Sequence, residues 1–336
     1  MHDLTVPSPH RNPTYLVWLW GPDHGLSCAG VAAVADAPAT LLAPGLAHVA
    51  TADPTPLHHF GYARALLGCL GRTALSDFAP PFDPNITIRG TFCVRVHRLG
   101  VADVIPSADV ARQVWRRVRG PRADLVHPET EIHVFATPTG FWWGVLLHAV
   151  DQAAFDARRP RDRPFWRSTA LAPRRARCLV NLSGIRPGAA LLDPFCGTGS
   201  ILIEAALVGA RPHGSEIDET VCAGAVRNLA HYGLHADLRR QDARHWRTAG
   251  IRFDAIVSDL PYGHSASLKG SDRDDLYRTF LEVAAEILNA HGRMVLMCRY
   301  GTLPGPPSDL ALVERFQEVV YGSLNREILV LRKNRR

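Results

Sequence analysis

The stretch Asp193–Ser200, which reads DPFCGTGS, combines a carboxylate with two glycines. It lies between an apolar strand pattern over Ala189–Phe195 and a helical pattern over Ile201–Val208, which predicts a strand, a tight turn and a helix. Glycine lets such a turn approach a ligand closely. No Gly-Lys-Ser/Thr follows, so the stretch is not a P-loop. It is not a dinucleotide site either, because a diphosphate is bound by amide donors rather than by a carboxylate. An acid before Gly-x-Gly suits the cationic amino-acid end of S-adenosylmethionine. We therefore assign this ligand to Asp193, Phe195, Cys196, Gly197, Thr198 and Gly199.

Further carboxylates follow the next two predicted strands. Glu216 lies 23 residues beyond the first carboxylate, near the end of the predicted strand Pro212–Ile217. A carboxylate about 20 residues after a glycine turn is placed to accept both ribose hydroxyls. Asp218 competes for this role, or caps the helix that follows. Asp242 is placed to receive the adenine amino group, or is a turn residue. We assign Glu216, Ile217 and Asp242 to the same cofactor.

A second motif, Ser258–Gly263 (SDLPYG), ends the predicted strand Phe253–Leu260. An exocyclic amine of a nucleobase is a weak nucleophile, because its lone pair is delocalised into the ring. The Asp259 carboxylate and a backbone carbonyl can accept hydrogen bonds from the two N–H groups of the amine and so direct its lone pair at a sulfonium methyl group, while Tyr262 stacks on the base. We therefore predict methyl transfer to a base amine, with Asp259, Pro261 and Tyr262 as catalytic residues and Asp259 also bordering the cofactor.

These motifs need a sheet whose strand ends meet at one edge. In the second half, nearly continuous apolar strand patterns alternate with helical ones, which predicts a doubly wound, mostly parallel sheet. Ligands of such sheets bind beyond the carboxyl ends of the strands. Besides the segments above, the predicted elements are a strand over Leu238–Gln241, helices over Val221–Tyr232 and Asp274–Leu288, and strands over Arg293–Tyr300 and Glu327–Arg332.

The first half has the mixed pattern of an α+β module. Its predicted elements are strands over Tyr15–Trp20 and Thr87–His97, helices over Leu57–Leu70 and Ala108–Val118, and a hairpin of Glu131–Thr137 with Phe141–His148.

Arginine dominates the basic residues, since only Lys269 and Lys333 are lysines among 38, and the net charge is +6. A polyanionic partner is one explanation of this charge. An arginine cluster over residues 158–177 has two open interpretations, a solvated linker or a track for phosphates. In the second interpretation, the RNA-binding candidates are Arg163, Arg167, Arg174, Arg175 and Arg177.

Composition excludes several other classes of protein. The 46% hydrophobic and 21% charged residues are ordinary for a globular chain of 336 residues, which excludes a largely disordered or fibrous one. The 7 cysteines form no Cys-x-x-Cys pair and the 16 histidines no His-Glu-x-x-His, so we expect no structural metal. No uncharged apolar run approaches the roughly 18–20 residues of a membrane span. We expect a soluble, cytoplasmic protein.

The chain resembles the THUMP-domain tRNA guanine-N2 methyltransferases over nearly its whole length. The turn at Asp193–Ser200 and its continuation Ile-Leu-Ile-Glu-Ala-Ala are similar to the cofactor motif of this family. The resemblance also rests on five further segments, RPFWRS from Arg163, LAPRRAR from Leu171, NLSG from Asn181, TFCVRVH from Thr91 and SLNREILVL from Ser323.

The resemblance implies a Rossmann-like methyltransferase domain behind an N-terminal ferredoxin-like piece and a THUMP module that grips the tRNA acceptor end. We expect an N-terminal subdomain over 1–55, the THUMP domain over 56–155, an arginine-rich linker over 156–180 and the methyltransferase domain over 181–336, with a terminal antiparallel hairpin. Some relatives also need a small activating subunit, and the sequence leaves that requirement open.

One departure from the family bears on the target. The motif here is Asp-Leu-Pro-Tyr, whereas members acting at tRNA position 10 usually carry Asp-Pro-Pro-Tyr and relatives acting at position 6 are more like Asp-Leu-Pro. Tyr262, Gly263 and the last strand resemble the position-10 group, which we favour. The alternatives are methylation of another exocyclic amine, on ribosomal RNA or DNA adenine, and an inactive RNA-binding module. The THUMP-like first half argues against a DNA enzyme, and the intact acidic and glycine positions argue against an inactive module.

Overall fold

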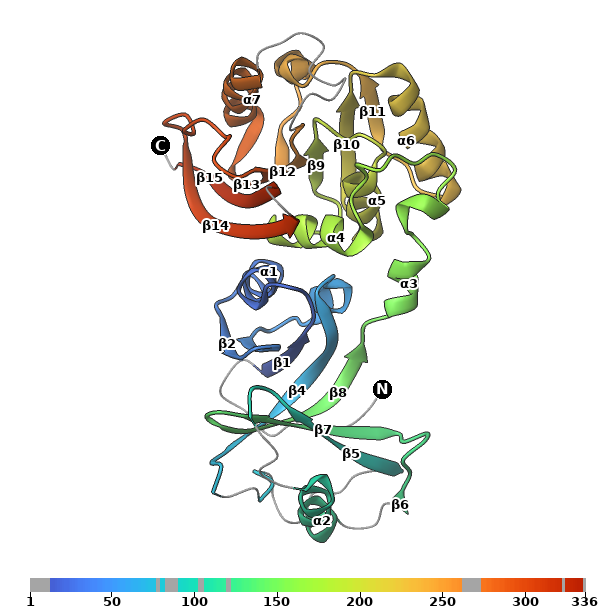
Figure 1. The fold of residues 1–336 in the computed structure, drawn as a ribbon, viewed down its shortest axis with the longest axis vertical. Coiled ribbons are helices and arrows are strands. Elements are labelled where there is room, and N and C mark those ends of the chain that lie inside the picture. The colour runs from blue at the N-terminus through green and yellow to red at the C-terminus, as the bar shows by residue number, and fades with distance from the viewer. Residues whose placement is uncertain are drawn as a thin grey trace. The chain divides into compact units, whose positions relative to one another are not determined.

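The computed structural model describes residues 13–76, 79–81, 90–101, 106–118, 122–261, 273–321 and 324–334. The chain divides into two compact units, Met1–Asp151 (unit 1) and Gln152–Arg336 (unit 2), each drawn as a ribbon in Figure 1. Within the described ranges, no helix combines the length and apolar character needed to cross a membrane.

Unit 1 is an α+β fold built on one eight-stranded sheet with the order β2-β3-β1-β4-β8-β7-β5-β6. Its elements are β1 (Thr14–Leu19), α1 (His24–Ala35), β2 (Ala39–Ala43), β3 (Leu46–Ala50), the 3₁₀ helix η1 (Thr55–His59), β4 (Ala63–Thr73), β5 (Thr91–Arg98), α2 (Ser107–Arg117), β6 (Arg122–Ala123), β7 (Thr130–Thr137) and β8 (Gly140–Ala149). The predicted strand over Tyr15–Trp20, the second helix and the β7–β8 hairpin are confirmed. The strand predicted over Thr87–His97 is confirmed from Thr91 onward, and its residues 87–89 lie outside the described residues. The division of this half at residue 55 into a ferredoxin-like piece and a THUMP module stays a prediction.

The helix predicted over Leu57–Leu70 is wrong. Its first residues lie in η1, and the rest belong to β4, which pairs with β1 on one side and β8 on the other. A central strand is covered on both faces, so Ala63 and the run 65–68 are all buried. Such a continuous apolar run has no alternation and cannot be distinguished from a buried helix by its periodicity.

Unit 2 contains a seven-stranded sheet with the order β11-β10-β9-β12-β13-β15-β14. Its elements are α3 (Gln152–Asp156), η2 (Pro160–Asp162), α4 (Pro173–Leu182), β9 (Ala190–Asp193), α5 (Ser200–Leu207), β10 (Arg211–Glu216), α6 (Glu219–His231), β11 (Asp237–Arg240), η3 (Ala243–Ala249), β12 (Phe253–Asp259), α7 (Arg273–Ile287), β13 (Leu288–Arg299), β14 (Leu310–Tyr321) and β15 (Leu324–Lys333).

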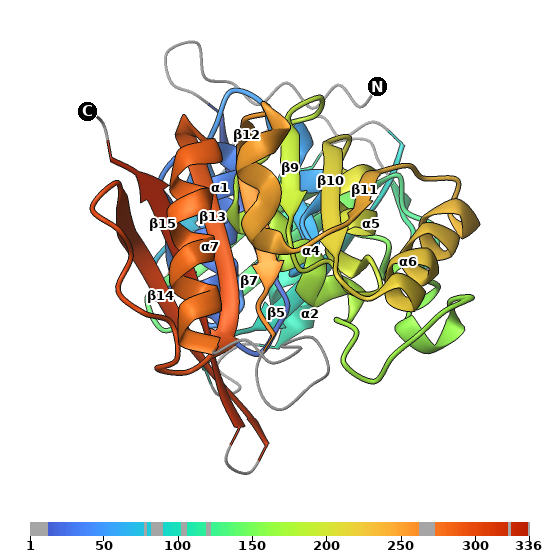
Figure 2. The same ribbon diagram turned by 90° about the horizontal axis from the view of Figure 1, so that it is seen from above.

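The sheet of unit 2 confirms the predicted doubly wound architecture. Strands β9 to β13 pair in parallel, and β15 joins β13 and β14 in antiparallel pairs, which forms the expected terminal hairpin. Strand order reverses between β9 and β12, which lie side by side in Figure 2. The carboxyl ends of neighbouring strands around such a reversal are where α/β sheets bind ligands.

The segment 156–180 corrects the prediction of a solvated linker. It contains η2 and most of α4, and its residues Arg163, Leu171, Ala176 and Cys178 are buried within unit 2. Arginine-rich composition suggested exposure, but partners inside the unit hold several of these side chains, as described below.

Candidate cofactor and catalytic site

The turn that joins β9 to α5 is tightly folded and its tip is open. Gly197 and Gly199 adopt φ angles of 52° and 84°, the left-handed region that glycine enters without strain. The Cys196 amide donates to the Ser215 carbonyl of β10 at 3.0 Å, which fastens the turn to the sheet. Among the described residues, a Cβ at Gly197 would meet nothing within 4 Å, whereas one at Gly214, just behind the turn, would lie 2.7 Å from Leu202. The part of the chain that the structure describes therefore leaves room for a ligand beside Gly197.

Asp193 ends β9 as a buried carboxylate, only 1% exposed. Its Oδ1 accepts a 2.6 Å hydrogen bond from the Ser258 hydroxyl of β12 and a 3.3 Å bond from the Phe195 amide. Burial raises the pKa of this carboxyl to about 7. A carboxylate with so little solvation gains strongly from a cationic group placed beside it, which fits the predicted ammonium partner.

The other turn residues are more enclosed than their neighbour Gly197. The Phe195 ring meets Phe280 of α7 edge-on, with 5.2 Å between centroids, and the side chains of Cys196 and Thr198 are buried. Burial raises the pKa of the Cys196 thiol well above its ordinary value. These residues shape the turn, so a ligand would meet chiefly their backbone.

Glu216 and Asp218 at the end of β10 are the two candidates for the ribose ligand, and their contacts distinguish them. Asp218 caps α6, because its Oδ1 accepts from the Val221 amide at 3.1 Å. Glu216 ends β10 with Ile217 beyond it, and its Oε1 accepts from the Asp218 amide at 2.9 Å. Burial raises the pKa of Glu216. Glu216 therefore stays the predicted ribose ligand, and Asp218 has the capping role.

Asp242 has partners that support its alternative role as a turn residue. Its Oδ1 accepts from the Arg244 amide at 2.9 Å, and its Oδ2 from the Arg244 guanidinium at 2.7 Å. Hydrogen bonding to that guanidinium lowers the pKa of Asp242. The carboxylate caps η3, and its adenine contact stays a prediction.

The second motif follows β12 beside the first. Asp259 is the last residue of β12 and is half-buried, and the Tyr277 hydroxyl of α7 donates to the Pro261 carbonyl at 2.6 Å. Tyr262, the predicted stacking residue, lies outside the described residues. Because Ser258 bonds to Asp193, the cofactor turn and Asp259 lie at adjacent strand ends of one sheet edge.

Leu260 explains how the backbone tolerates the loss of proline in this motif. Its amide donates to the Met297 carbonyl of β13 at 2.8 Å, a bond that proline could not make. Its side chain is 1% exposed and belongs to the hydrophobic core with Tyr277 and Phe280. A hydrogen bond and burial therefore fix the chain where proline would restrict φ.

The structure does not bring the five RNA-binding candidates to one surface. Arg163 and Arg177 are each 4% exposed. Arg163 donates to Ser200 at 2.7 Å, and Arg177 pairs with Glu204 at 2.8 Å. These two predictions are corrected, since a buried guanidinium with partners inside the protein presents no face to a phosphate.

The other three candidates are more accessible. Arg175 pairs with Glu318 of β14, and Arg174 donates to the Gln152 carbonyl and lies over the Phe155 ring. Arg167 is exposed beside Phe165, so its predicted RNA contact stays open.

Several residues that shape the site escaped the sequence analysis. Ser258 adjoins the predicted Asp259, yet a lone serine at a strand end gave no sign of its bond to Asp193. Asn228 of α6 is fully buried and bonds to the Thr198 carbonyl at 3.0 Å. Glu204 did carry a signal, because a carboxylate within the apolar helix SILIEAAL must be paired if it is buried.

Comparison with known proteins shows the family of the chain. A family model described as "RMKL-like, methyltransferase domain" matches residues 160–302. A tRNA (guanine(10)-N2)-dimethyltransferase of Methanothermobacter thermautotrophicus is 36% identical over 280 residues, which cover 81% of this chain and 83% of the relative. A tRNA (guanine(6)-N2)-methyltransferase of Thermus thermophilus is 31% identical over 241 residues, 69% of this chain and 68% of the relative.

A solved structure resembles the fold of this chain over nearly its whole length. The crystal structure of TrmN from Thermus thermophilus matches with a TM-score of 0.52 and 24% identity, over 96% of this chain and 100% of that chain. The archaeal alignment of 280 residues is longer than unit 2, so the sequence similarity extends into unit 1. The chain is therefore an enzyme that belongs to the family of tRNA (guanine-N2)-methyltransferases.

Proposed function

We propose that this enzyme uses S-adenosylmethionine to methylate the N2 amine of guanosine 10 in tRNA. The observation that carries the proposal is the 2.6 Å hydrogen bond from Ser258 to Asp193. It joins the end of the cofactor strand to the strand that ends in Asp259, so that a methyl donor at one and a base amine at the other share one edge of the sheet.

The chain's residues account for both halves of the reaction. S-adenosylmethionine supplies an electrophilic methyl group on a sulfonium. Asp193 and Glu216 would receive its ammonium and ribose hydroxyls, while the open tip of the turn at Gly197 leaves it room. Asp259 would accept an N–H bond of the guanine amine and orient its lone pair, which is a positioning and electrostatic contribution. The Tyr277 hydroxyl donates to the Pro261 carbonyl and so fastens the backbone two residues after Asp259.

The relatives favour position 10 as the target. Two relatives named for guanine 10 are 36% and 33% identical over 81% and 73% of this chain, and a third is 31% identical over 66%, whereas one named for guanine 6 is 31% identical over 69%. The names of the first two specify a dimethyltransferase, so we expect N2,N2-dimethylguanosine as the final product. A tRNA substrate also suggests that the enzyme works in the cytoplasm.

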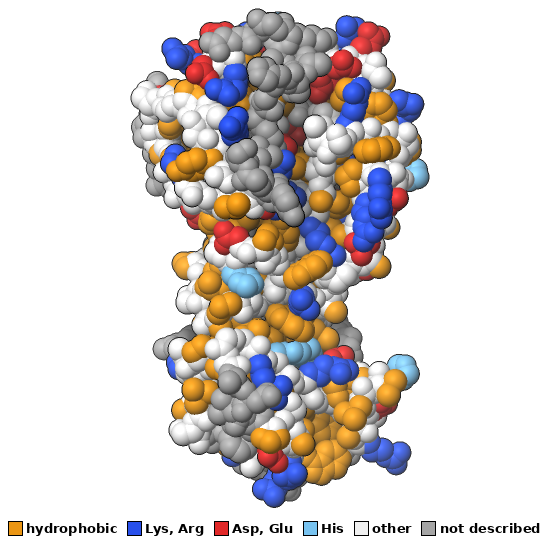
Figure 3. Space-filling view, in the orientation of Figure 1, with side chains coloured by type: hydrophobic (Ala, Val, Ile, Leu, Met, Phe, Trp, Pro, Cys, Tyr) orange, Lys and Arg blue, Asp and Glu red, His pale blue; other side chains and the backbone are white. Residues whose placement is uncertain are grey.

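We infer that unit 1, which contains the predicted THUMP domain over 56–155 except for its last four residues, supplies most of the tRNA contacts. Trp115 of α2 is 51% exposed and stacks on Phe92 with 5.5 Å between ring centroids, and Arg112 and Arg116 are exposed on the same helix. Figure 3 shows apolar and basic side chains interleaved on the visible face of unit 1. Aromatic rings beside basic groups are suited to unpaired bases and their phosphates.

The test is a methyl-transfer assay on unmodified tRNA transcripts with guanosine or adenosine at position 10, followed by nucleoside mass spectrometry. We expect N2-methylated guanosine only in the transcript with guanosine 10. Product from the transcript with adenosine 10 would place the target elsewhere, with position 6 tested next. Cofactor binding without any product would indicate a missing partner, such as a small activating subunit, or another substrate. Absence of cofactor binding would refute the proposal.

A further inference from the structure

Residues 158–165 make hydrogen bonds and ion pairs to α5, the helix that begins directly after the cofactor turn. Arg163 is buried, and its Nη1 donates to the Ser200 hydroxyl at 2.7 Å, while its Nε and Nη2 donate to the Arg158 carbonyl at 3.1 and 2.9 Å. Ser200 is the first residue of α5 and follows Gly199. One guanidinium therefore ties the end of the turn to the backbone of a distant segment.

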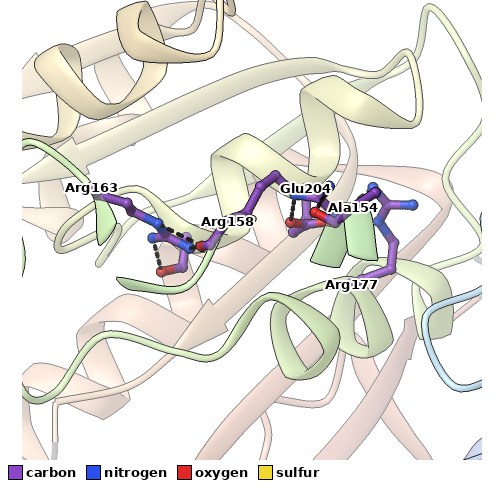
Figure 4. A network of polar contacts seen from close by, with 6 residues as sticks. Ala154, Arg158, Arg163, Arg177 and Glu204 are labelled. Carbon is purple, nitrogen blue, oxygen red and sulfur yellow. Dashed lines mark hydrogen bonds and ion pairs between the residues drawn. The ribbon is translucent and has the colours of Figure 1, made fainter. Parts of the chain in front are cut away.

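A second arginine of the same segment holds the next turn of α5. The Arg158 guanidinium donates to both oxygens of Glu204, at 2.9 and 3.2 Å, and to the Ala154 carbonyl at 2.6 Å (Figure 4). Arg177 of α4 adds a 2.8 Å ion pair to the same carboxylate. Positions 200 and 204 lie on one face of the helix, because residues four apart are neighbours there. The segment is thus fixed to two successive turns of α5.

The end of the segment reaches the turn from its other side, through α6. The Phe165 amide donates to the Asn228 side-chain carbonyl at 3.0 Å, and the Asn228 amide donates to the carbonyls of Phe165 and Thr198 at 2.7 and 3.0 Å. The Phe165 ring lies directly on α6, since a Cβ at Gly224 would fall 2.1 Å from it. The Thr198 carbonyl lies between the two glycines of the turn.

We propose that Arg163 and Asn228 are positioning residues of the cofactor site, which hold residues 197–200 in the conformation that receives S-adenosylmethionine. Gly197 and Gly199 have no side chains to restrict them, so a turn without outside support would lose conformational entropy on binding. Holding the turn beforehand removes that cost and tightens binding. The inference rests on the proposed function, because it takes Asp193–Ser200 as the cofactor turn.

The test is a double-mutant cycle of Arg163→Met and Ser200→Ala, with the dissociation constant of S-adenosylmethionine measured by calorimetry. We expect each single variant to weaken cofactor binding about tenfold, because a turn that lacks this bond must be ordered when the cofactor binds. Because both changes remove the same bond, the double variant should be little weaker than either single one. At saturating cofactor, kcat and the tRNA affinity should stay within about twofold of wild type, a split that general destabilisation would not produce.

Arg161→Met is the matched control, since this arginine belongs to the same segment but is exposed and pairs only loosely with Asp162, at 3.9 Å. If Arg163→Met fails to fold, Ser200→Ala decides alone, because it removes one hydroxyl and keeps the bonds of Arg163 to the Arg158 carbonyl. Wild-type cofactor affinity in Ser200→Ala, or additive effects in the cycle, would overturn the positioning role. Failure of the wild-type enzyme to bind the cofactor would instead refute the proposed function itself.

Discussion

At the scale of single residues, Asp259 stands at the end of β12 while the following residue is anchored by its amide and its buried side chain. We expect Asp259→Ala to lower kcat by about 100-fold or more, the usual cost of removing one preorganised polar contact from an active site. Cofactor and tRNA affinities should change by less than about threefold, because the turn and unit 1 are untouched. Single-turnover methylation together with calorimetry checks both expectations.

The control for this variant is Glu314→Gln, which removes an exposed carboxylate from β14. Near-normal methylation by Asp259→Ala would show that another group orients the amine. A tenfold loss of cofactor affinity would move Asp259 from the acceptor role to the cofactor-binding role.

Asp193 predicts how cofactor binding depends on pH. Burial raises the pKa of this carboxyl to about 7, above its ordinary value of 3.8. Below pH 7 it holds a proton and offers no negative charge to an ammonium group. Cofactor affinity should therefore rise as pH increases from about 6 to 8, and Asp193→Asn should remove most of this dependence. Calorimetric titrations at several pH values measure it.

The raised pKa of Asp193 also makes the stability of the cofactor-free enzyme depend on pH, in the direction opposite to that of cofactor affinity. Between about pH 4 and 7 the folded state holds a proton on Asp193 that the unfolded chain has released, so this group's contribution to stability falls as pH rises through that interval.

Ser258→Ala removes a hydrogen-bond donor to the charged form of Asp193, so the pH midpoint of cofactor binding should move to higher pH. An unchanged midpoint would show that the 2.6 Å bond does not favour the carboxylate.

At the scale of elements, sequence patterns predict the strands and helices of the site better than the contacts that hold those elements in place. β9 and β12 were predictable because each is a short apolar run that ends at a turn signal, in a part of the chain where such runs alternate with helical patterns. β4 was not, since a central strand covered on both faces loses its alternation. The strand β14, Leu310–Tyr321, was also missed, because its apolar residues do not alternate regularly with its polar ones, and Leu312, Val313 and Val319 are exposed.

The ion pairs that hold α5 could not be predicted from the sequence, for a different reason. Nothing local to residues 158–177 shows that these arginines face a carboxylate more than 25 positions away, because ion pairs between distant segments depend on tertiary contacts. The arginine-rich composition therefore suggested a linker or a phosphate track. The helix α5 itself held the clue, since Glu204 is its one charged residue and is fully buried.

Glu204→Gln tests this buried network. The change leaves Arg158 and Arg177 near each other without their carboxylate, and removing one partner of a buried ion pair typically costs about 3–5 kcal/mol. We expect the free energy of unfolding, measured in urea, to fall by about that amount. Glu318→Gln is the matched control, because its pair with Arg175 is partly exposed and should contribute about 1 kcal/mol or less. Equal losses in the two variants would refute a special role for the buried pair.

At the scale of the whole molecule, our proposals assign cofactor binding and catalysis to unit 2 and most tRNA contacts to unit 1. The predicted cofactor and catalytic residues that the structure describes all belong to unit 2, whereas Trp115 and its neighbouring arginines belong to unit 1. A change on α2 should consequently alter tRNA binding and leave cofactor binding unchanged. Reduced methylation by such a variant should be restored by raising the tRNA concentration.

Two variants of α2 separate the kinds of contact that unit 1 makes. Arg116→Glu removes a phosphate contact, so the slope of log K against log salt concentration should become shallower by about one. Trp115→Ala removes stacking, which contributes about 1–3 kcal/mol per base and releases no counterions. It should weaken tRNA binding while the salt slope stays that of wild type. Fluorescence titrations with tRNA at several salt concentrations measure both quantities. A shallower slope for Trp115→Ala, or wild-type behaviour of both variants, would mean that tRNA binds unit 1 elsewhere than at α2.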